Sequence, residues 1–468
     1  MRLSTHLKSG LRLGSSVAAL CGAFAGSALA ASPSPAEQIA SVGYKARYLV
    51  SPPYSQIVPD SGVHRKGHAR TNYRLLVLPA GAAPPKVTAN AASPLTATPP
   101  APTYLVNTPG SLACIYGLVS ANGTHCNPNT AGQVSNLGSK AIAIVDAFDY
   151  PAALSDANLY SAQFGLPPLT NSTFVQTWVG TSAPPLDTTG WSVEAALDIQ
   201  MAHAMAPAAK IIFVEAQSDS NDDLFAAVDL ATKLVAEAGG GQVSMSWGTD
   251  EDQSQTVYES HFTPPNPPNY VNYYAAAGDS GDTFFPDLLG LASTDTAHTP
   301  ALYPATSPQV IAVGGTSTSF DYRTGDFLRQ TSWADAGAGP SLVFSRPAFQ
   351  NSVANVVGNR RGVPDLSAVA NPDTGVWIVQ TDPTLGFILG PLWYTVGGTS
   401  VASPLVAGIA NAAKAFNPTT VSTLTQIYAK ASAFKDVTVG YCGPYAVWTA
   451  GVGYDFCTGV GTPGLQTP

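Results

Sequence analysis

Charged residues are scarce in this chain of 468 amino acids: Lys, Arg, Asp and Glu together make up 11% of it, against about 25% in a typical soluble domain. The charges are also unevenly placed. Residues 31–105 contain seven Lys and Arg against two acids, a net charge of +5, whereas residues 106–468 contain 11 against 28, a net charge of −17. An acidic body disfavours nucleic acid as a partner. Because few native ion pairs exist to be lost when carboxylates protonate, the composition is compatible with an acidic working environment.

Apolar runs long enough to cross a membrane are lacking as well. The N-terminal run SSVAALCGAFAGSALA is too short for a span, follows Arg2, Lys8 and Arg12, and ends in an A-x-A pattern at Ala30. These features predict a secretory signal peptide over residues 1–30. We therefore expect a secreted protein, extracellular or periplasmic, with no membrane span.

Cysteines are few, and none forms a C-x-x-C pair that would indicate zinc. Cys21 lies in the predicted signal peptide, which leaves Cys114, Cys126, Cys442 and Cys457. An even number in an oxidising compartment predicts two disulfides. Pairing of sequence neighbours is the simplest of three connectivities, and the sequence leaves the choice open.

Residues 31–105 form a short basic segment rich in Pro, Ala, Ser and Thr, which we interpret as a leader or pro-segment. From about residue 104 apolar strand patterns alternate with helical ones, so that residues 106–468 are predicted to form one domain. The strands are expected at 141–148, 209–216, 242–248 and 270–281, and the helices at 193–206 and 222–241. This alternation predicts an α/β fold, a mostly parallel sheet with helices on both faces and functional loops at the carboxyl ends of its strands.

The tetrapeptide GGTS occurs twice, and each copy offers a serine after two glycines as a candidate nucleophile. Ser317 is followed by further β-rich sequence. Ser400 is followed by an alanine-rich helical pattern with Pro404 in its first turn. A helix N-terminus presents unpaired N–H groups and favours developing negative charge. The sequence therefore favours Ser400.

A nucleophilic serine needs a base. Glu194 and Asp198 are four residues apart on one face of a predicted helix that is otherwise apolar, with no Lys or Arg within a turn. Two such acids repel, so one tends to keep a proton, which suits a carboxylate base with a carboxylate partner. An exposed acidic stripe is the alternative interpretation. A third acid, Asp279, follows an apolar strand in a glycine-containing turn.

These pieces together resemble the sedolisin family of serine-carboxyl peptidases, whose fold is subtilisin-like. The resemblance rests on five motifs in the family's order across roughly residues 104–468: Glu194-x-x-x-Asp198, SMSWG at 244–248, AAGDSGD at 276–282, RGVPDLSAVANPDTG at 361–375 and GGTSVASP at 397–404. It implies that Ser400 is the nucleophile, that Glu194 is the general base and that Asp198 orients and tunes it. It also implies that a protonated Asp279 donates to the oxyanion.

The resemblance further implies one structural Ca²⁺ in the C-terminal loops, held by carboxylates of Asp436 and Asp455 and by backbone carbonyls of Val437, Gly451 and Gly453. A glycine-rich turn closed by a disulfide is the alternative. Asp146, where a subtilisin-type aspartate would stand, lacks a matching histidine motif and is interpreted as structural or supporting.

The predicted function is that of a secreted serine-carboxyl endopeptidase acting on peptides or proteins at roughly pH 3–5 through a Ser-Glu-Asp triad. We expect a monomer, with the basic leader docking on the acidic body and inhibiting it. Residues 31–105 are, however, shorter and richer in Pro than the large folded pro-domain usual in the family. The alternatives are an inactive sedolisin-like binding module and a His-dependent subtilisin.

Overall fold

The structure is a computed structural model, and it describes residues 47–51, 54–76, 106–119, 126–127, 132, 134–263, 270–281, 301–321, 326–443 and 447–468. The predicted signal peptide lies outside these residues, as does the linker between residues 77 and 105. Within them, no helix is long and apolar enough to cross a membrane.

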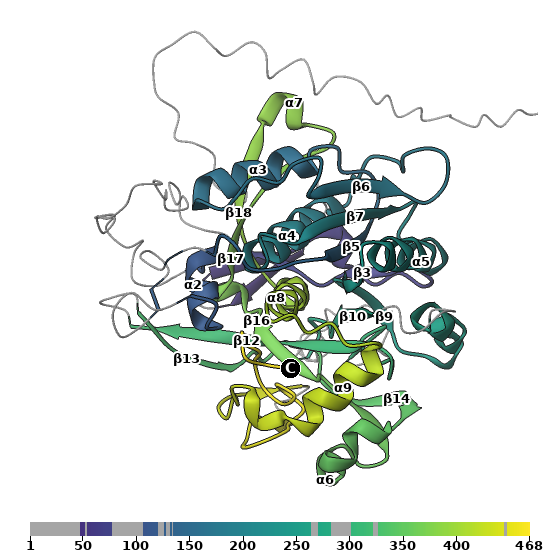
Figure 1. Cartoon of the computed structure of the whole chain (residues 1–468), viewed down its shortest axis with the longest axis vertical. Helices are drawn as coiled ribbons and strands as arrows, with labels where there is room; N and C mark the ends of the chain where they lie inside the picture. Colours follow the sequence, from purple (N-terminus) through teal and green to yellow (C-terminus); the bar gives the residue numbers. More distant parts are fainter. Residues whose placement is uncertain are drawn as a thin grey trace, which may run out of the picture.

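An eight-stranded sheet forms the centre of the molecule, and all of its strands are parallel except the antiparallel edge strand β13 (Figure 1). Along the sheet, the strands are β6 (Phe174–Trp178), β7 (Lys210–Ala216), β5 (Ala141–Ala147), β8 (Gly241–Met245), β10 (Val271–Ala276), β12 (Ile311–Phe320) and β13 (Phe327–Ser332), with β16 (Leu366–Val369) also paired to β12. The inner parallel strands β5, β7, β8 and β10 are almost wholly buried, as their apolar runs predicted, whereas the edge strand β6 is only partly buried.

Helices cover both faces of this sheet, which confirms the predicted α/β class. On one face lie α4 (Trp191–Met205) and α8 (Thr399–Ala412), and on the other lies α5 (Asn221–Glu237). The remaining helices are α2 (Pro109–Ile115), α3 (Ala153–Phe164), α6 (Ala354–Val357), α7 (Gly386–Leu389) and α9 (Thr420–Ala429), and the 3₁₀ turns are η1 (Asp60–Gly62), η2 (Gln253–Phe262), η4 (Ala348–Val353), η5 (Pro372–Thr374) and η6 (Ala431–Ala433).

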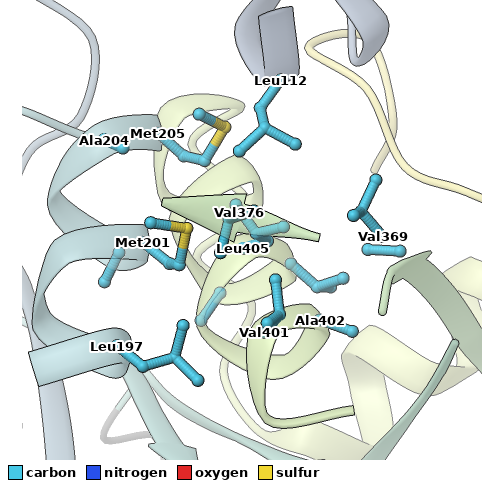
Figure 2. Packing of buried hydrophobic residues seen from close by; sticks show 14 of the residues in the cluster. Leu112, Leu197, Met201, Ala204, Met205, Val369, Val376, Val401, Ala402 and Leu405 are labelled. Carbon is cyan, nitrogen blue, oxygen red and sulfur yellow. The ribbon is translucent and has the colours of Figure 1, made fainter. Parts of the chain in front are cut away.

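The packing of α4 against α8 positions the candidate residues (Figure 2). Leu197, Met201 and Met205 of α4 lie in one apolar cluster with Val401 and Leu405 of α8, and all five are buried. The two helices approach closely because α8 has a glycine at the contact. An added Cβ on Gly408 would stand 2.8 Å from the Cβ of Met205. This contact lies in the C-terminal halves of the two helices, and Leu197 with Val401 continues the packing toward their N-terminal turns.

Part of the basic leader belongs to the folded body. Its strands β1 (Arg47–Ser51), β2 (Tyr54–Val58) and β4 (Arg74–Leu76) continue an antiparallel sheet whose other strands are β18 (Pro391–Gly397) and β17 (Val376–Thr381). A further strand, β3 (Arg70–Thr71), pairs with β9 (Trp247–Asp250), which in turn pairs with β11 (Leu302–Tyr303). The described residues on the two sides of the 105/106 boundary are therefore packed together.

Two small hairpin-like pairs lie toward the C-terminus, β14 (Gly339–Ser345) with β15 (Arg360–Val363) and β19 (Tyr441–Cys442) with β20 (Trp448–Thr449). The structure contains the two disulfides that the cysteine count predicted. They join Cys114 to Cys126 and Cys442 to Cys457, so the pairing of sequence neighbours is the one adopted.

Candidate active site

Ser400 is the second residue of α8, which begins at Thr399 directly after the N-cap residue Gly398 at the end of strand β18. This is the helix N-terminus that the sequence predicted. The side chain is fully buried, and its Oγ lies within hydrogen-bond distance of two acceptors that share its one proton, Oε2 of Glu194 at 2.9 Å and the carbonyl of Ser246 at 3.0 Å. Ser400 is therefore bonded to a carboxylate and lies where the helix dipole favours negative charge.

Glu194 and Asp198 lie one turn apart on α4 and are both completely buried, which excludes the exposed acidic stripe. Asp198 accepts two bonds of 2.8 Å from the hydroxyl of Ser246. Ser246 thus links Asp198 to Ser400, because its carbonyl accepts from the nucleophile. In the sequence, the SMSWG motif indicated no role for Ser246. Its link between Asp198 and Ser400 is visible only in the folded structure.

Burial dominates the electrostatics of this pair. It raises the pKa of Glu194 well above its usual value, and the nearby charges of Asp198 and Asp146 raise it further, while the hydrogen bond from Ser400 lowers it. Burial and Asp146 likewise raise the pKa of Asp198. Asp146 itself is fully buried on β5, and neither of its carboxyl oxygens has a hydrogen-bond partner among the described residues. At least one proton is therefore held within the group of acids.

Asp279 lies just after β10, facing the start of α8. Its Oδ1 accepts from the backbone N–H of Thr399 at 2.8 Å and from the hydroxyl of Thr399 at 2.9 Å. The residue is partly exposed, but Oδ2 is enclosed and without a partner among the described residues. Burial raises the pKa of Asp279 to about 7, partly opposed by the charge of Arg74 and by the bonds from Thr399. Its carboxyl is therefore protonated in acid.

The structure brings leader residues to the same point, which the sequence did not predict in detail. The backbone N–H of Asn72 lies 3.1 Å from Ser400 Oγ, and the carbonyl of Asn72 accepts from the N–H of Ser400 at 3.0 Å. Arg74 donates to the backbone carbonyl of Asp279 at 2.6 Å and pairs with Asp335 at 2.5 Å. In the sequence, the signal for these contacts is the pair of arginines, Arg70 and Arg74, that stand on either side of Asn72 in RTNYR.

Ser317, in the other GGTS copy, lies within β12 and accepts a bond of 3.0 Å from the side chain of Asn371. The two copies are therefore in different environments, as predicted. The contacts of the described histidines lie elsewhere: His64 with Asp250, His68 with Asp219, His203 with the carbonyl of Pro167, and His261 with Asp229. These contacts agree with the absence of a histidine motif.

The candidate calcium residues come together beside the Cys442–Cys457 disulfide. Asp455 accepts from the N–H of Gly451 at 2.9 Å, and Asp436 accepts from the N–H of Gly453 at 2.8 Å. The hydroxyl of Thr458 reaches both Asp455 and the carbonyl of Val437. Two carboxylates and a backbone carbonyl gathered in this way fit the oxygen ligands that Ca²⁺ prefers. Among the described residues, no three His, Cys, Asp or Glu side chains form a metal cluster, so such a site depends on backbone oxygens.

Comparison with known proteins places the chain in the peptidase class that the sequence motifs indicated. The model of the subtilase family (Peptidase S8) matches residues 189–441, more than half of the chain, which therefore belongs to that family. Its relatives are sedolisins. Kumamolisin of Bacillus sp. (strain MN-32) is 32% identical over 308 residues, 60% of this chain and 51% of kumamolisin. Sedolisin of Pseudomonas sp. (strain 101) is 33% identical over 177 residues, 34% of this chain and 28% of sedolisin.

The fold is shared with a solved structure of Pseudomonas sedolisin, a serine-carboxyl proteinase. The TM-score is 0.59 at 23% identity, over 77% of this chain and 96% of that one. The subtilisin-like fold implied by the sequence motifs is thus confirmed. The alignments span about half the length of kumamolisin and less of sedolisin.

Proposed function

We propose that this protein is a secreted serine-carboxyl endopeptidase in which Ser400 attacks the peptide bond and Glu194 is its general base. The single observation that carries the proposal is the 2.9 Å hydrogen bond from Ser400 Oγ to Glu194 Oε2, at the N-terminus of α8 and out of contact with water. A nucleophile and a base within hydrogen-bond reach are what this chemistry requires. Peptides and proteins are the proposed substrates, and the proposed active form is a monomer.

Glu194 takes the hydroxyl proton as Ser400 Oγ bonds to the substrate carbonyl carbon, and it returns the proton to the leaving amine. Asp198 assists through its charge, because like-charged buried neighbours raise the proton affinity of Glu194. The hydroxyl of Ser246 donates to Asp198, and its carbonyl accepts from Ser400. These two bonds fix the positions of Asp198 and Ser400 relative to each other. Water then hydrolyses the acyl-enzyme by the same route in reverse.

The negative oxygen of the tetrahedral intermediate needs donors that are already in position. The N–H of Ser400 is one, and a protonated Asp279 is the other. Asp279 Oδ2 is enclosed, partnerless among the described residues, and lies next to Gly398. Gly398 has φ 122°, and an added Cβ there would meet Oδ2 at 2.6 Å. A glycine therefore leaves the room in which a substrate carbonyl approaches both donors.

Activity requires an ionised Glu194 and a protonated Asp279, which gives a bell-shaped pH dependence. In the structure, leader residues cover the site, and burial is the largest cause of both raised pKa values. Departure of the leader admits water, which lowers both pKa values toward the ordinary range of carboxyls near pH ~4. We therefore place the activity of the open site on the acidic side of neutrality.

The leader is proposed to inhibit the site it covers. Its arginines pair with acids of the body, Arg70 with Asp250 at 2.8 Å and Arg74 with Asp335 at 2.5 Å, and Nδ1 of His68 lies 2.7 Å from Oδ1 of Asp219. Arg65 also pairs with Asp219, and His64 with Asp250. These pairs weaken when the carboxylates protonate and when salt screens them. Release of the leader is therefore favoured in acid.

One structural Ca²⁺ is proposed in the C-terminal loops. Asp436, Asp455 and the carbonyls of Val437, Gly451 and Gly453 would hold it. The ion would neutralise the buried carboxylate of Asp455, whose pKa burial raises to about 6 in the absence of a cation. Its contribution would be to hold together the loops that the Cys442–Cys457 disulfide also joins.

The test is digestion of a denatured protein by the secreted protein across a series of acidic pH values. Ser400→Ala should abolish it. Ser317→Ala is the matched control, since it removes a hydroxyl from the same tetrapeptide in β12 and should retain activity. Folding of both variants is checked by circular dichroism. Equal loss of activity in two folded variants would contradict the assignment of Ser400.

A further inference from the structure

Residues Arg70–Leu76, here called the docked segment, cross the site as an extended chain paired on both sides. Arg70 and Thr71 lie antiparallel to Gly248 and Trp247 of β9, and Arg74–Leu76 lie antiparallel to β18. Adding a strand to a sheet edge is a general way in which proteins bind extended peptides. The two residues between the paired stretches, Asn72 and Tyr73, lie at Ser400.

The peptide bond between them is presented to Ser400 in the manner of a substrate. The carbonyl of Asn72 accepts from the N–H of Ser400 at 3.0 Å, and its N–H lies 3.1 Å from Ser400 Oγ. The same carbonyl oxygen lies beside Gly398, where an added Cβ would stand only 2.1 Å from it and 2.6 Å from Asp279 Oδ2. The oxygen thus accepts from one of the two groups assigned above as oxyanion donors, the N–H of Ser400, and shares Gly398 as a neighbour with the other, Asp279 Oδ2.

Side-chain contacts anchor the segment on each side of this bond. The Arg70 guanidinium pairs with Asp250 at 2.8 Å, with side-chain exposures of 6% and 14%. The Arg74 guanidinium pairs with Asp335 at 2.5 Å, with exposures of 6% and 25%, and lies over the ring of Trp333. A charge left buried without its partner is costly, so such pairs select for cations.

We infer that the Asn72–Tyr73 bond is the one this site cuts in its own chain, and that Asp250 and Asp335 are specificity residues. They select substrates with a cation at the third residue before and the second residue after the scissile bond. Tyr73 adds an aromatic preference directly after the bond, because its hydroxyl donates to the carbonyl of Gly190 at 2.8 Å and its ring is buried. The inference rests on the proposed peptidase function and names its substrate class.

The step balances as an ordinary acyl transfer. Ser400 Oγ bonds to the carbonyl carbon of Asn72 while its proton passes to Glu194, and the bond to the nitrogen of Tyr73 breaks as that nitrogen takes the proton. Water then splits the ester. The products are a carboxylate on Asn72 and a free amine on Tyr73.

Self-cleavage is tested on the full-length chain. Wild type and Ser400→Ala are incubated in acid, and the new N-termini are sequenced. Wild type should yield a chain that begins at Tyr73, and Ser400→Ala should not. Digestion of a denatured protein is measured in the same samples. If wild type digests that protein but its own chain is cut at another bond, the peptidase function stands and this inference fails. If neither cleavage depends on Ser400, both fail.

Specificity is tested with a synthetic peptide of residues 67–79, GHARTNYRLLVLP. Asp250→Asn and Asp335→Asn should each lower kcat/KM for this peptide by roughly tenfold or more. Each enzyme variant should be insensitive to Arg→Gln at its own partner position in the peptide, and should keep its sensitivity at the other position. Asp252→Asn is the control, since Asp252 is an exposed helix cap that asparagine replaces well. If kcat/KM of Asp250→Asn and Asp335→Asn falls equally for every peptide, or does not fall, the specificity assignment is overturned.

Discussion

The contribution of the Asp279 carboxyl to stability should depend on pH in the direction opposite to that of an ordinary ion-paired carboxylate. Its folded-state pKa is about 7, against 3.8 for an ordinary aspartate, chiefly through burial. A group whose pKa is raised on folding stabilises the protein below its unfolded pKa. That contribution is lost as pH rises through the folded pKa. This contribution should therefore fall between about pH 4 and pH 7.

The magnitude follows from the shift. A pKa that rises from 3.8 to about 7, at about 1.4 kcal/mol for each pH unit, corresponds to about 4 kcal/mol. This is an upper value, because Asp279 is partly exposed as a residue. Asp279→Asn keeps the acceptor that Thr399 uses and cannot ionise. The variant should match the parent at pH 4 and exceed its free energy of unfolding by about 2–4 kcal/mol at pH 7.5.

The measurement is chemical denaturation at both pH values in a Ser400→Ala background, which prevents self-digestion. Glu237→Gln serves as the control, because the Glu237 side chain is 60% exposed, and surface acids contribute little. If the free energy of unfolding of Asp279→Asn exceeds that of its parent no more at pH 7.5 than at pH 4, the raised pKa of Asp279 is refuted. The role of Asp279 as a protonated donor would then be refuted as well.

Two further predictions concern the leader and the calcium loop. A peptide of residues 54–72, which ends at the proposed cleavage bond, should inhibit the processed enzyme at low salt. High salt or glutamine at Arg70 should weaken the inhibition, because the ion pair of Arg70 with Asp250 contributes to docking; absence of inhibition at low salt would exclude the leader as inhibitor. A chelator should lower the melting temperature of wild type by several degrees and should have no effect on Asp455→Asn. Elemental analysis should show that the chelator removes one Ca²⁺ per wild-type chain, and wild type without bound Ca²⁺ would contradict the metal assignment.

Local patterns in the sequence determined most of the fold and the main candidates. Buried parallel strands read as apolar runs, so β5 and β7 were predicted within a residue or two of their observed ends. The helix after the second GGTS was recognisable from its alanines and Pro404, and it distinguished Ser400 from Ser317. The spacing of Glu194 and Asp198 placed them on one face of α4 because helix periodicity is a local property.

Tertiary structure decided what these residues contact. Burial of Glu194 and Asp198 depends on α8 packing over α4, and a pattern in one helix does not reveal what covers it. Ser246 joins Asp198 to Ser400 across three elements, and Asp279 reaches Thr399 across 120 positions of sequence. The leader appeared in the sequence as a Pro-rich basic stretch. Its strands β3 and β4 pair with the edges of β9 and β18, and such pairing is a property of the assembled sheets.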